Sequence, residues 1–214
     1  MRLSAFFASA VVAFLIGGCE EAPVAPQEVL EEPWFELHGE WLGVSGGVAE
    51  EKDGVLRMSW GEALTAVRWQ GEVPSVPFEL EAEARRIDGT DFFFSVTFPG
   101  RTEEEAASLI VGGWGGGVVG ISSIDGLDAS ENETTLVRPF EVNRWYEIRM
   151  EVTPEHLRVW IDGEGVIDVP IEGKTLSLRS GPIEQCLPFG VATWQTTGEA
   201  RGMRWRPLSE GLQP

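Results

Sequence analysis

Short segments of alternating apolar and polar residues, separated by turns, are the feature that most constrains the fold of this chain. Segment 78–86, FELEAEARR, places its Phe, Leu and Ala residues on one side and its Glu residues and one Arg on the other. A β-strand with one buried face shows this alternation. The other segments with strand character are 54–60, 63–69, 91–98, 107–114, 117–122, 144–152, 156–162, 165–171, 188–196 and 200–208.

Turn residues separate these segments. The pair Asp162-Gly163 lies between two of them and supplies the positive φ angles that a tight hairpin needs. Only residues 102–107, TEEEAA, have helical character. About eleven to thirteen short strands follow one another without an interior linker. We therefore predict an all-β fold, a two-sheet antiparallel jelly-roll sandwich.

The N-terminal sequence MRLSAFFASAVVAFLIGGC predicts export. Arg2 precedes an apolar run shorter than the roughly 20 residues of a membrane-spanning helix, which is the arrangement of a signal peptide. The ending IGGC resembles the lipobox of bacterial lipoproteins. That resemblance implies a signal peptide over 1–18 and a lipid on Cys19, and Glu20 implies the outer membrane, with the domain in the periplasm or at the cell surface. The alternative is an ordinary signal peptide with an incidental cysteine.

The rest of the chain divides simply. Residues 19–33 are acidic and Pro-rich and predict a tether, 34–208 form the domain, and 209–214 are a short tail. Within the domain Cys186 is the single cysteine, so we expect a buried structural thiol and no intramolecular disulfide there. The net charge of −19 argues against binding to nucleic acid or anionic lipid. Sugars, cations and neutral molecules remain as ligand classes compatible with this charge.

Residues 112–135, GGWGGGVVGISSIDGLDASENETT, contain seven glycines. This density favours a bulged, curved strand or a close approach of the backbone to a ligand or neighbour. Trp114 has small neighbours on both sides, which leaves its ring open for stacking on a sugar, and Trp194 is a second such candidate. We expect the other strand tryptophans in the core: Trp60, Trp69, Trp145, Trp160 and Trp205.

Oxygen-bearing side chains follow the glycines. Sugar hydroxyls would suit Asp125, Asp128, Glu131 and Asn132, joined by Trp114, Trp194 and Gln195 to form the predicted ligand site. Asp125, Asp128 and Glu131 also suit Ca²⁺, the one cofactor considered, although their spacing does not fit the EF-hand pattern. The alternative is a solvated acidic loop whose side chains cap turns.

A second acidic stretch lies in segment 78–86. Glu79, Glu81 and Glu83 are similar to the ExDxE strand of laminarinase-type glycoside hydrolases, with Glu81 where that family has Asp. On a regular strand Glu79 and Glu83 stand about 13 Å apart, whereas a retaining hydrolase needs about 5–5.5 Å. We favour a solvated sheet face balanced by arginines of a neighbouring strand. His38 and His156 have no motif around them, so no catalytic residue is assigned.

The order of the segments DGVLRM, FELEAEARR, RWYEIRMEV, LRVWIDG and PFGVATW resembles the concanavalin A-like, laminin-G-like jelly rolls. More narrowly, it is similar to the bacterial 3-keto-disaccharide hydrolase family and a planctomycete-type lipoprotein subgroup. This resemblance implies the fold and leaves binding and hydrolysis open.

These observations predict a function at the cell envelope. We predict a monomeric exported lipoprotein that binds carbohydrate or a glycan-bearing partner. One alternative is a hydrolase or lyase acting on 3-keto-disaccharides or β-glucans, with carboxylates such as Asp125, Asp128 or Glu81 as acid and base. The other is a structural protein-interaction module.

Overall fold

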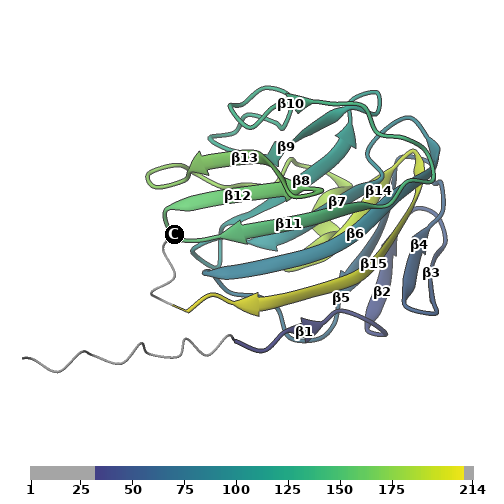
Figure 1. The fold of residues 1–214 in the computed structure, drawn as a ribbon, viewed down its shortest axis with the longest axis horizontal. Helices are drawn as coiled ribbons and strands as arrows, with labels where there is room; N and C mark the ends of the chain where they lie inside the picture. The colour runs from purple at the N-terminus through teal and green to yellow at the C-terminus, as the bar shows by residue number, and fades with distance from the viewer. Residues whose placement is uncertain (1–31, 210–214) are drawn as a thin grey trace, which may run out of the picture. The chain divides into compact units, whose positions relative to one another are not determined.

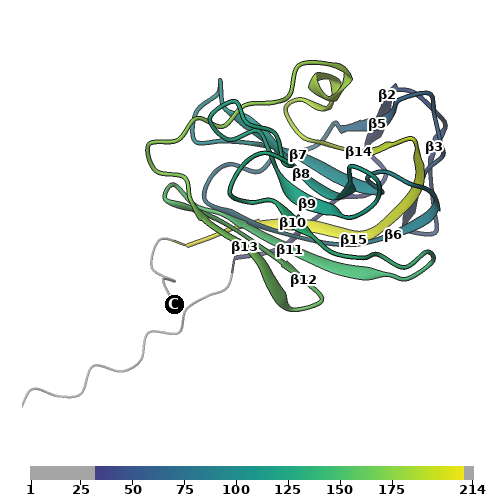
Figure 2. The same cartoon turned by 90° about the horizontal axis from the view of Figure 1, so that it is seen from above.

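The structure is a computed structural model in which residues 32–209 are described. The predicted signal peptide, Cys19 and most of the predicted tether lie outside these residues, as does the tail after 209. The described residues form two antiparallel sheets packed face to face (Figures 1 and 2). Helices able to span a bilayer are absent from residues 32–209.

Sheet A is the eight-stranded layer. Its spatial order is β13 (Glu164–Pro170), β12 (His156–Ile161), β11 (Tyr146–Val152), β6 (Phe78–Gly89), β15 (Thr196–Pro207), β4 (Val55–Met58) and β3 (Ala49–Lys52), and β1 (Phe35–Glu36) pairs with the end of β15. The hairpin β12–β13 turns at Asp162 and Gly163, whose φ angles are 52° and 76°. The predicted tight turn is therefore confirmed.

Sheet B is the seven-stranded layer. Its order is β10 (Leu136–Val137), β9 (Val118–Ser122), β8 (Ala106–Gly113), β7 (Phe94–Pro99), β14 (Gly190–Trp194), β5 (Leu64–Trp69) and β2 (Trp41–Ser45). A short 3-10 helix, η1 (Pro182–Cys186), lies on the side of sheet B that faces away from sheet A, where it is the small coil in Figure 2.

The predicted jelly-roll sandwich is confirmed, and the eleven predicted strands correspond to β4–β9 and β11–β15. The short strands β1, β2, β3 and β10 were not predicted. The helix predicted at 102–107 is wrong, because this segment is the turn of the β7–β8 hairpin. An ion pair of 2.6 Å between Arg101 and Glu105 closes that turn, and Ala106 already pairs with Pro99.

Strand alternation builds the core between the sheets. On β6 the residues Phe78, Leu80, Ala82 and Ala84 are buried and face inward, as their spacing predicts. Sheet B presents Phe94, Val96 and Phe98 of β7 to them, together with apolar residues of β8, β9, β5 and β14. Outward residues of the two sheets differ sharply in polarity, and this difference locates the candidate site.

The tryptophan prediction is correct only in part. Trp69 and Trp205 lie in the core, 6% and 4% exposed. Trp60 is 54% exposed in the connection between β4 and β5. Trp145 and Trp160 are half-buried outside the core because they have the outward parity of sheet A, where arginine side chains stack on their rings.

Candidate functional site

The outer face of sheet A carries an ion-pair ladder, which we define as Glu79, Glu81, Glu83 and Arg85 of β6 with Glu199, Arg201, Arg204 and Arg206 of β15 and Arg149 of β11. The pairing register of β15 with β6 explains the ladder, because Arg204 lies opposite Glu81, Arg206 opposite Glu79 and Arg201 opposite Glu83. The bonds between these side chains measure 2.6 Å, 2.8 Å and 2.7 Å.

Tryptophan rings complete the ladder. Arg85 and Arg201 lie 4.4 Å and 4.1 Å from the ring centre of Trp145, and Arg149 lies 3.8 Å from that of Trp160. Arg204 and Arg206 both lie 4.4 Å from the ring centre of Trp34. Cation–π contacts of this kind occupy ring faces that a sugar would need.

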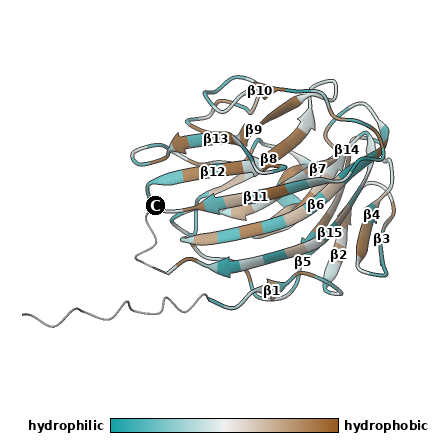
Figure 3. Ribbon diagram, in the orientation of Figure 1, coloured by the Kyte–Doolittle hydropathy of each residue, from teal (hydrophilic) through white to brown (hydrophobic). Residues whose placement is uncertain are grey.

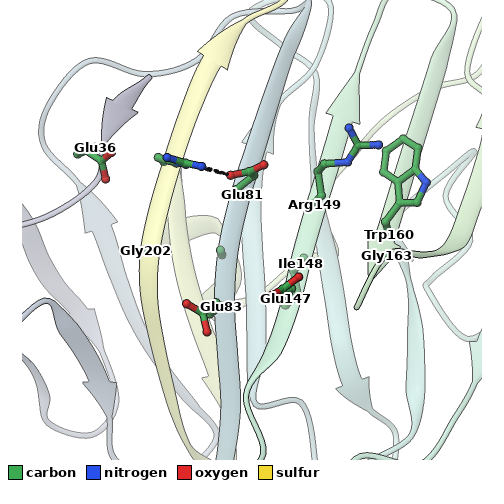
Figure 4. A pocket seen from close by; sticks show the side chains of 11 residues that line it. Glu36, Glu81, Glu83, Glu147, Ile148, Arg149, Trp160, Gly163 and Gly202 are labelled. Carbon is green, nitrogen blue, oxygen red and sulfur yellow. Dashed lines mark hydrogen bonds and ion pairs between the residues drawn. The ribbon is translucent and has the colours of Figure 1, made fainter. Parts of the chain in front are cut away.

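The ladder engages the carboxylates of the acidic segment of β6 in ion pairs. Figure 4 shows the groove over this face, with Glu81 joined to an arginine and the Arg149 side chain reaching toward the indole of Trp160. The groove has a volume of about 700 Å³. Glu81 accepts two bonds from Arg204 at 2.9 Å and 2.6 Å, and no bulge brings Glu79 toward Glu83. The prediction of a charge-balanced sheet face is confirmed.

The outer face of sheet B is nearly free of charge. Its outward residues include Ala66 of β5, Ser95 and Thr97 of β7, Ser108 of β8 and Ala192 of β14. Figure 3 shows β8 and β9 coloured as hydrophobic over much of their length, whereas β6, β11 and β15 alternate. The 3-10 helix covers part of this face through Cys186 and Ile183, which pack on Leu64, Ala66 and Ala192.

An aromatic cleft lies beside the 3-10 helix. We define it by its aromatic residues Phe92, Trp114 and Trp194, its charged residues Asp91, Asp128 and Arg179, and the wall formed by 180–183. Its volume is about 400 Å³. Leu64, Ile110, Ser108 and Ser122 also line it. The residues come from segments far apart in the chain, brought together by β5, β8, β9 and β14 of one sheet.

Trp114 lies at the rim and is 41% exposed. Its backbone has a φ of 46°, a left-handed conformation in the turn between β8 and β9. The backbone N–H of Trp114 donates to Asp91 Oδ1 at 3.2 Å, and the N–H of Phe92 donates to the same oxygen at 2.8 Å. Asp91 thus ties the two aromatic segments of the cleft together.

Trp194 and Phe92 form the inner part of the cleft. Their ring centres are 6.3 Å apart with an interplanar angle of 37°. The backbone N–H of Trp194 donates to the carbonyl of Phe92 at 3.0 Å. Ile183 packs against the same apolar cluster as these two rings, so the 3-10 helix borders them.

A buried arginine explains two glycines of the glycine-rich stretch, Gly112 and Gly116. Arg86 is 6% exposed and donates from Nη2 to the carbonyl oxygens of Asp91, Gly112 and Gly116 at 3.2, 3.2 and 2.9 Å. A Cβ at Gly112 would lie 2.7 Å from the Arg86 guanidinium. Burial lowers the pKa of Arg86, an effect that the charge of Asp91 opposes. The bulge predicted for this strand is also present, as a register shift between Val111 and Gly113.

Asp128 is the one predicted oxygen ligand that lines the cleft. Its carboxylate accepts from the Ser122 hydroxyl, from the backbone N–H of Ala129 at 2.9 Å and from Arg179 at 2.7 Å. The Arg179 side chain is 65% exposed. The cleft therefore presents both a hydrogen-bond acceptor and a cation to a ligand.

The other predicted site residues lie elsewhere. Asp125 caps the neighbouring loop by accepting from the backbone N–H of Thr175 at 2.8 Å. Asn132 is 8% exposed and donates to the carbonyl oxygens of Ile121 and Leu127. Glu131 and Gln195 are exposed and do not line the cleft. Of the seven predicted ligand residues, the cleft thus unites Trp114, Asp128 and Trp194.

The predicted calcium ligands are not gathered into one group. Among residues 32–209, no three His, Cys, Asp or Glu side chains come together in a way that could hold a metal ion. Asp125, Asp128 and Glu131 instead have the separate surroundings described above. Calcium binding through them stays a prediction, without support from the placement of these carboxylates.

Ser108 and Ser122 bring hydroxyl groups to the cleft, whereas the cysteine and the histidines of residues 32–209 lie elsewhere. Cys186 is fully buried, and burial raises the pKa of its thiol to about 12. The prediction of a structural cysteine is therefore confirmed. His38 is exposed beside β1, and His156 contacts Asp168 at the edge of sheet A. Neither histidine lines the aromatic cleft.

Sequence reasoning missed Phe92, Asp91 and Arg179. Strand alternation would place Phe92 on the same side as Phe94, but Phe92 and Phe93 precede β7, so this periodicity does not apply to them. Phe93 and Phe94 are fully buried, and Phe92 lines the cleft. Arg179 is a single cation in a polar loop, and nothing in its neighbours predicts that it meets Asp128.

Known structures share this fold at low sequence identity. The carbohydrate-binding module CBM66 from Bacillus subtilis is 16% identical with a TM-score of 0.54, over 78% of this chain and 95% of that one. The carbohydrate recognition domain of Emp46p is 12% identical with a TM-score of 0.53, over 79% and 89% of the two chains. Its metal-free form is 13% identical with a TM-score of 0.52, over the same shares.

These similarities support a concanavalin A-like jelly roll, a fold that many functions share. No family model matches this chain, and no curated protein matches its sequence. The narrower resemblance to 3-keto-disaccharide hydrolases therefore stays a prediction.

Proposed function

We propose that the protein binds a saccharide in the aromatic cleft. The observation that carries this proposal is that Trp114, from the β8–β9 turn, and Trp194, from the end of β14, line one cleft with Asp128 and Arg179. The C–H groups of a sugar ring stack on the negative face of an indole. Its hydroxyl groups need a few fixed acceptors and donors beside that ring.

The surroundings of the cleft support this ligand class. Trp114 presents an open ring, whereas the rings of Trp34, Trp145 and Trp160 on the opposite face are engaged by arginines. The net charge of −19 disfavours polyanionic ligands. Two structures of similar fold have names that describe carbohydrate-binding proteins, and this agrees with the proposal without assigning a ligand.

A glycan array probed with the fluorescently labelled domain tests the proposal, followed by calorimetry with the best saccharide. We expect saturable binding that Trp114→Ala weakens by about tenfold or more. Trp160→Ala is the matched control, because it removes an indole from the other face, and it should leave the affinity unchanged. Binding that survives Trp114→Ala and Trp194→Ala together would refute the cleft as the saccharide site.

Hydrolysis is a separate question that the same saccharide answers. Three carboxylates are candidates for acid or base. Glu81 is bonded to Arg204, Asp125 caps a loop, and Asp128 is paired with Arg179. Each is thus engaged in a contact within the fold. We expect the bound saccharide to be recovered intact after long incubation. Release of product that is lost in Asp128→Asn would favour the hydrolase or lyase alternative.

We also propose that the exported protein is a lipoprotein anchored through Cys19. The support is the leader sequence with its IGGC ending. Metabolic labelling with a fatty acid, followed by membrane fractionation, tests this anchor. We expect label in the outer membrane fraction for the natural chain and none for Cys19→Ser, and equal labelling of both would contradict the proposal.

A further inference from the structure

Arg86 occupies an unusual position for a cation. It lies on β6 with the inward parity of Phe78, Leu80, Ala82 and Ala84, so it enters the space between the two sheets rather than the ion-pair ladder. Its neighbour Arg85 faces outward and pairs with Glu199 at 2.6 Å. Strand β6 of sheet A thus places the Arg86 side chain against loops of sheet B.

The guanidinium of Arg86 contacts two of the three segments that carry the aromatic residues of the cleft. It donates to the carbonyl of Asp91, next to Phe92, and to the carbonyls of Gly112 and Gly116, which flank Trp114. It also lies 5.1 Å from the ring centre of Phe93. Its Nε has no hydrogen-bond partner although it is buried, so the site accepts a desolvation cost to hold the group there.

The glycines fit this contact closely. At Gly116, whose φ is +101°, an added Cβ would lie 3.1 Å from Nη1 and 3.3 Å from Nη2 of Arg86. At Gly115, whose φ is +87°, an added Cβ would meet nothing within 4 Å. The carbonyl oxygen of Thr90 would also lie 3.3 Å from the Cβ at Gly116. The two adjacent glycines therefore differ in whether a Cβ would meet Arg86 and Thr90 or open space.

We propose that Arg86 is a positioning residue for the aromatic cleft, which holds the Trp114 turn and the Phe92 segment from behind. Its consequence for binding rests on the proposed saccharide site, whereas its effect on the turn does not. Removing the arginine would leave three carbonyl oxygens without this donor and release the turn that presents the Trp114 ring. Saccharide affinity would fall even though Arg86 does not line the cleft.

Two matched pairs of variants test this role, Arg86→Lys against Arg85→Lys and Gly116→Ala against Gly115→Ala. Lysine keeps the charge, but a single ammonium cannot reproduce the planar fork of guanidinium donors. Hydrogen exchange of the amides in 112–117 reports the turn, and exchange in β11 reports global unfolding. Calorimetry with the saccharide identified on the array reports binding.

We expect Arg86→Lys and Gly116→Ala to speed exchange in 112–117 by about tenfold relative to β11 and to weaken saccharide binding by a similar factor. Arg85→Lys should leave the turn and the affinity unchanged. Gly115→Ala shares the strain of a positive φ but makes no contact with Arg86, so its effect should be clearly smaller than that of Gly116→Ala. Unchanged exchange in Arg86→Lys would overturn the proposal, as would equal effects of Gly115→Ala and Gly116→Ala.

Two further outcomes keep the proposals separate. If Arg86→Lys does not fold, the glycine pair decides, because both of its members retain the arginine. If the natural protein binds no saccharide, the proposed function fails, while the exchange measurements still decide whether Arg86 holds the turn.

Discussion

The two outer faces of this sandwich carry the same residue types, but these side chains are engaged differently on each face. Sheet A carries tryptophans, arginines and carboxylates, yet Arg85 and Arg201 both contact the ring of Trp145. Glu79, Glu81 and Glu83 each accept from an arginine. Sheet B carries few charges, and its Trp114 is open to solvent beside Asp128 and Arg179. Residues available to a ligand are those that the fold leaves incompletely engaged.

The largest effect we expect is on the free energy of unfolding, through the ion pairs of sheet A. Glu79 is nearly buried and accepts from Arg149 at 3.1 Å and from Arg206 at 2.8 Å. We expect Glu79→Gln to lower the free energy of unfolding by about 2–3 kcal/mol, because two arginines lose their charged acceptor. Urea denaturation measures this loss.

Glu83→Gln is the control for that variant. Glu83 is 36% exposed and pairs with Arg201 alone among the described side chains. We expect a change of less than about 0.5 kcal/mol. If the two substitutions cost the same, burial does not determine the strength of the ladder.

The next effect concerns binding. Arg179 is the cation at the cleft and is 65% exposed, so Arg179→Ala should change the free energy of unfolding by less than about 0.5 kcal/mol. We expect it to weaken saccharide binding by about tenfold, as loss of a charged donor does. Calorimetry measures the affinity. Arg144→Ala, on an exposed ion pair outside the cleft, is the control, and an equal loss there would contradict the assignment.

A smaller effect is the pH dependence of sheet A. Burial alone would raise the pKa of Glu199, but hydrogen bonds from Arg85 and Arg57 outweigh burial and hold it below its ordinary value. Its stabilising contribution is therefore present above about pH 4.3 and is lost as the pH falls through the lower pKa of the folded state. We expect Glu199→Gln to flatten the loss of stability below that pH. If the melting temperature of Glu199→Gln falls with decreasing pH as steeply as that of the natural protein, this prediction is wrong.

The smallest effect is that of salt on binding. Between about 0.1 M and 1 M salt the Debye length falls from about 10 Å to about 3 Å. Because stacking on Trp114 and Trp194 involves little net charge, we expect the saccharide affinity to change by less than about twofold over that range. A steep salt dependence, measured by calorimetry, would show that charge rather than stacking dominates the cleft.

The fold was predictable because strand alternation is a local signal. Segment 78–86 specifies its buried face residue by residue, and Asp162-Gly163 specifies its turn. The two-residue strands β1 and β10 carry no such signal and depend on pairing with β15 and β9. Segment 102–107 has helix-forming residues, but the pairing of β7 with β8 makes it a turn.

The candidate site was predictable only where chemistry was visible along the chain. Trp114, with glycines around it, and Trp194, among polar residues, were identifiable as candidates for stacking. Phe92, Asp91 and Arg179 reach the cleft through tertiary packing, which sequence spacing does not determine. The glycines suggested a ligand or a neighbour, and the structure shows that the neighbour of Gly112 and Gly116 is Arg86.

Tryptophan indole resonances during a saccharide titration test the central claim most directly, because each face of the sandwich has its own indoles. After assignment by single Trp→Phe variants, the indole N–H signals of Trp114 and Trp194 should shift with added saccharide. Those of Trp145 and Trp160, on the ion-pair ladder, should stay in place. Shifts at Trp145 and Trp160 with none at Trp114 would contradict the account and place the ligand on sheet A.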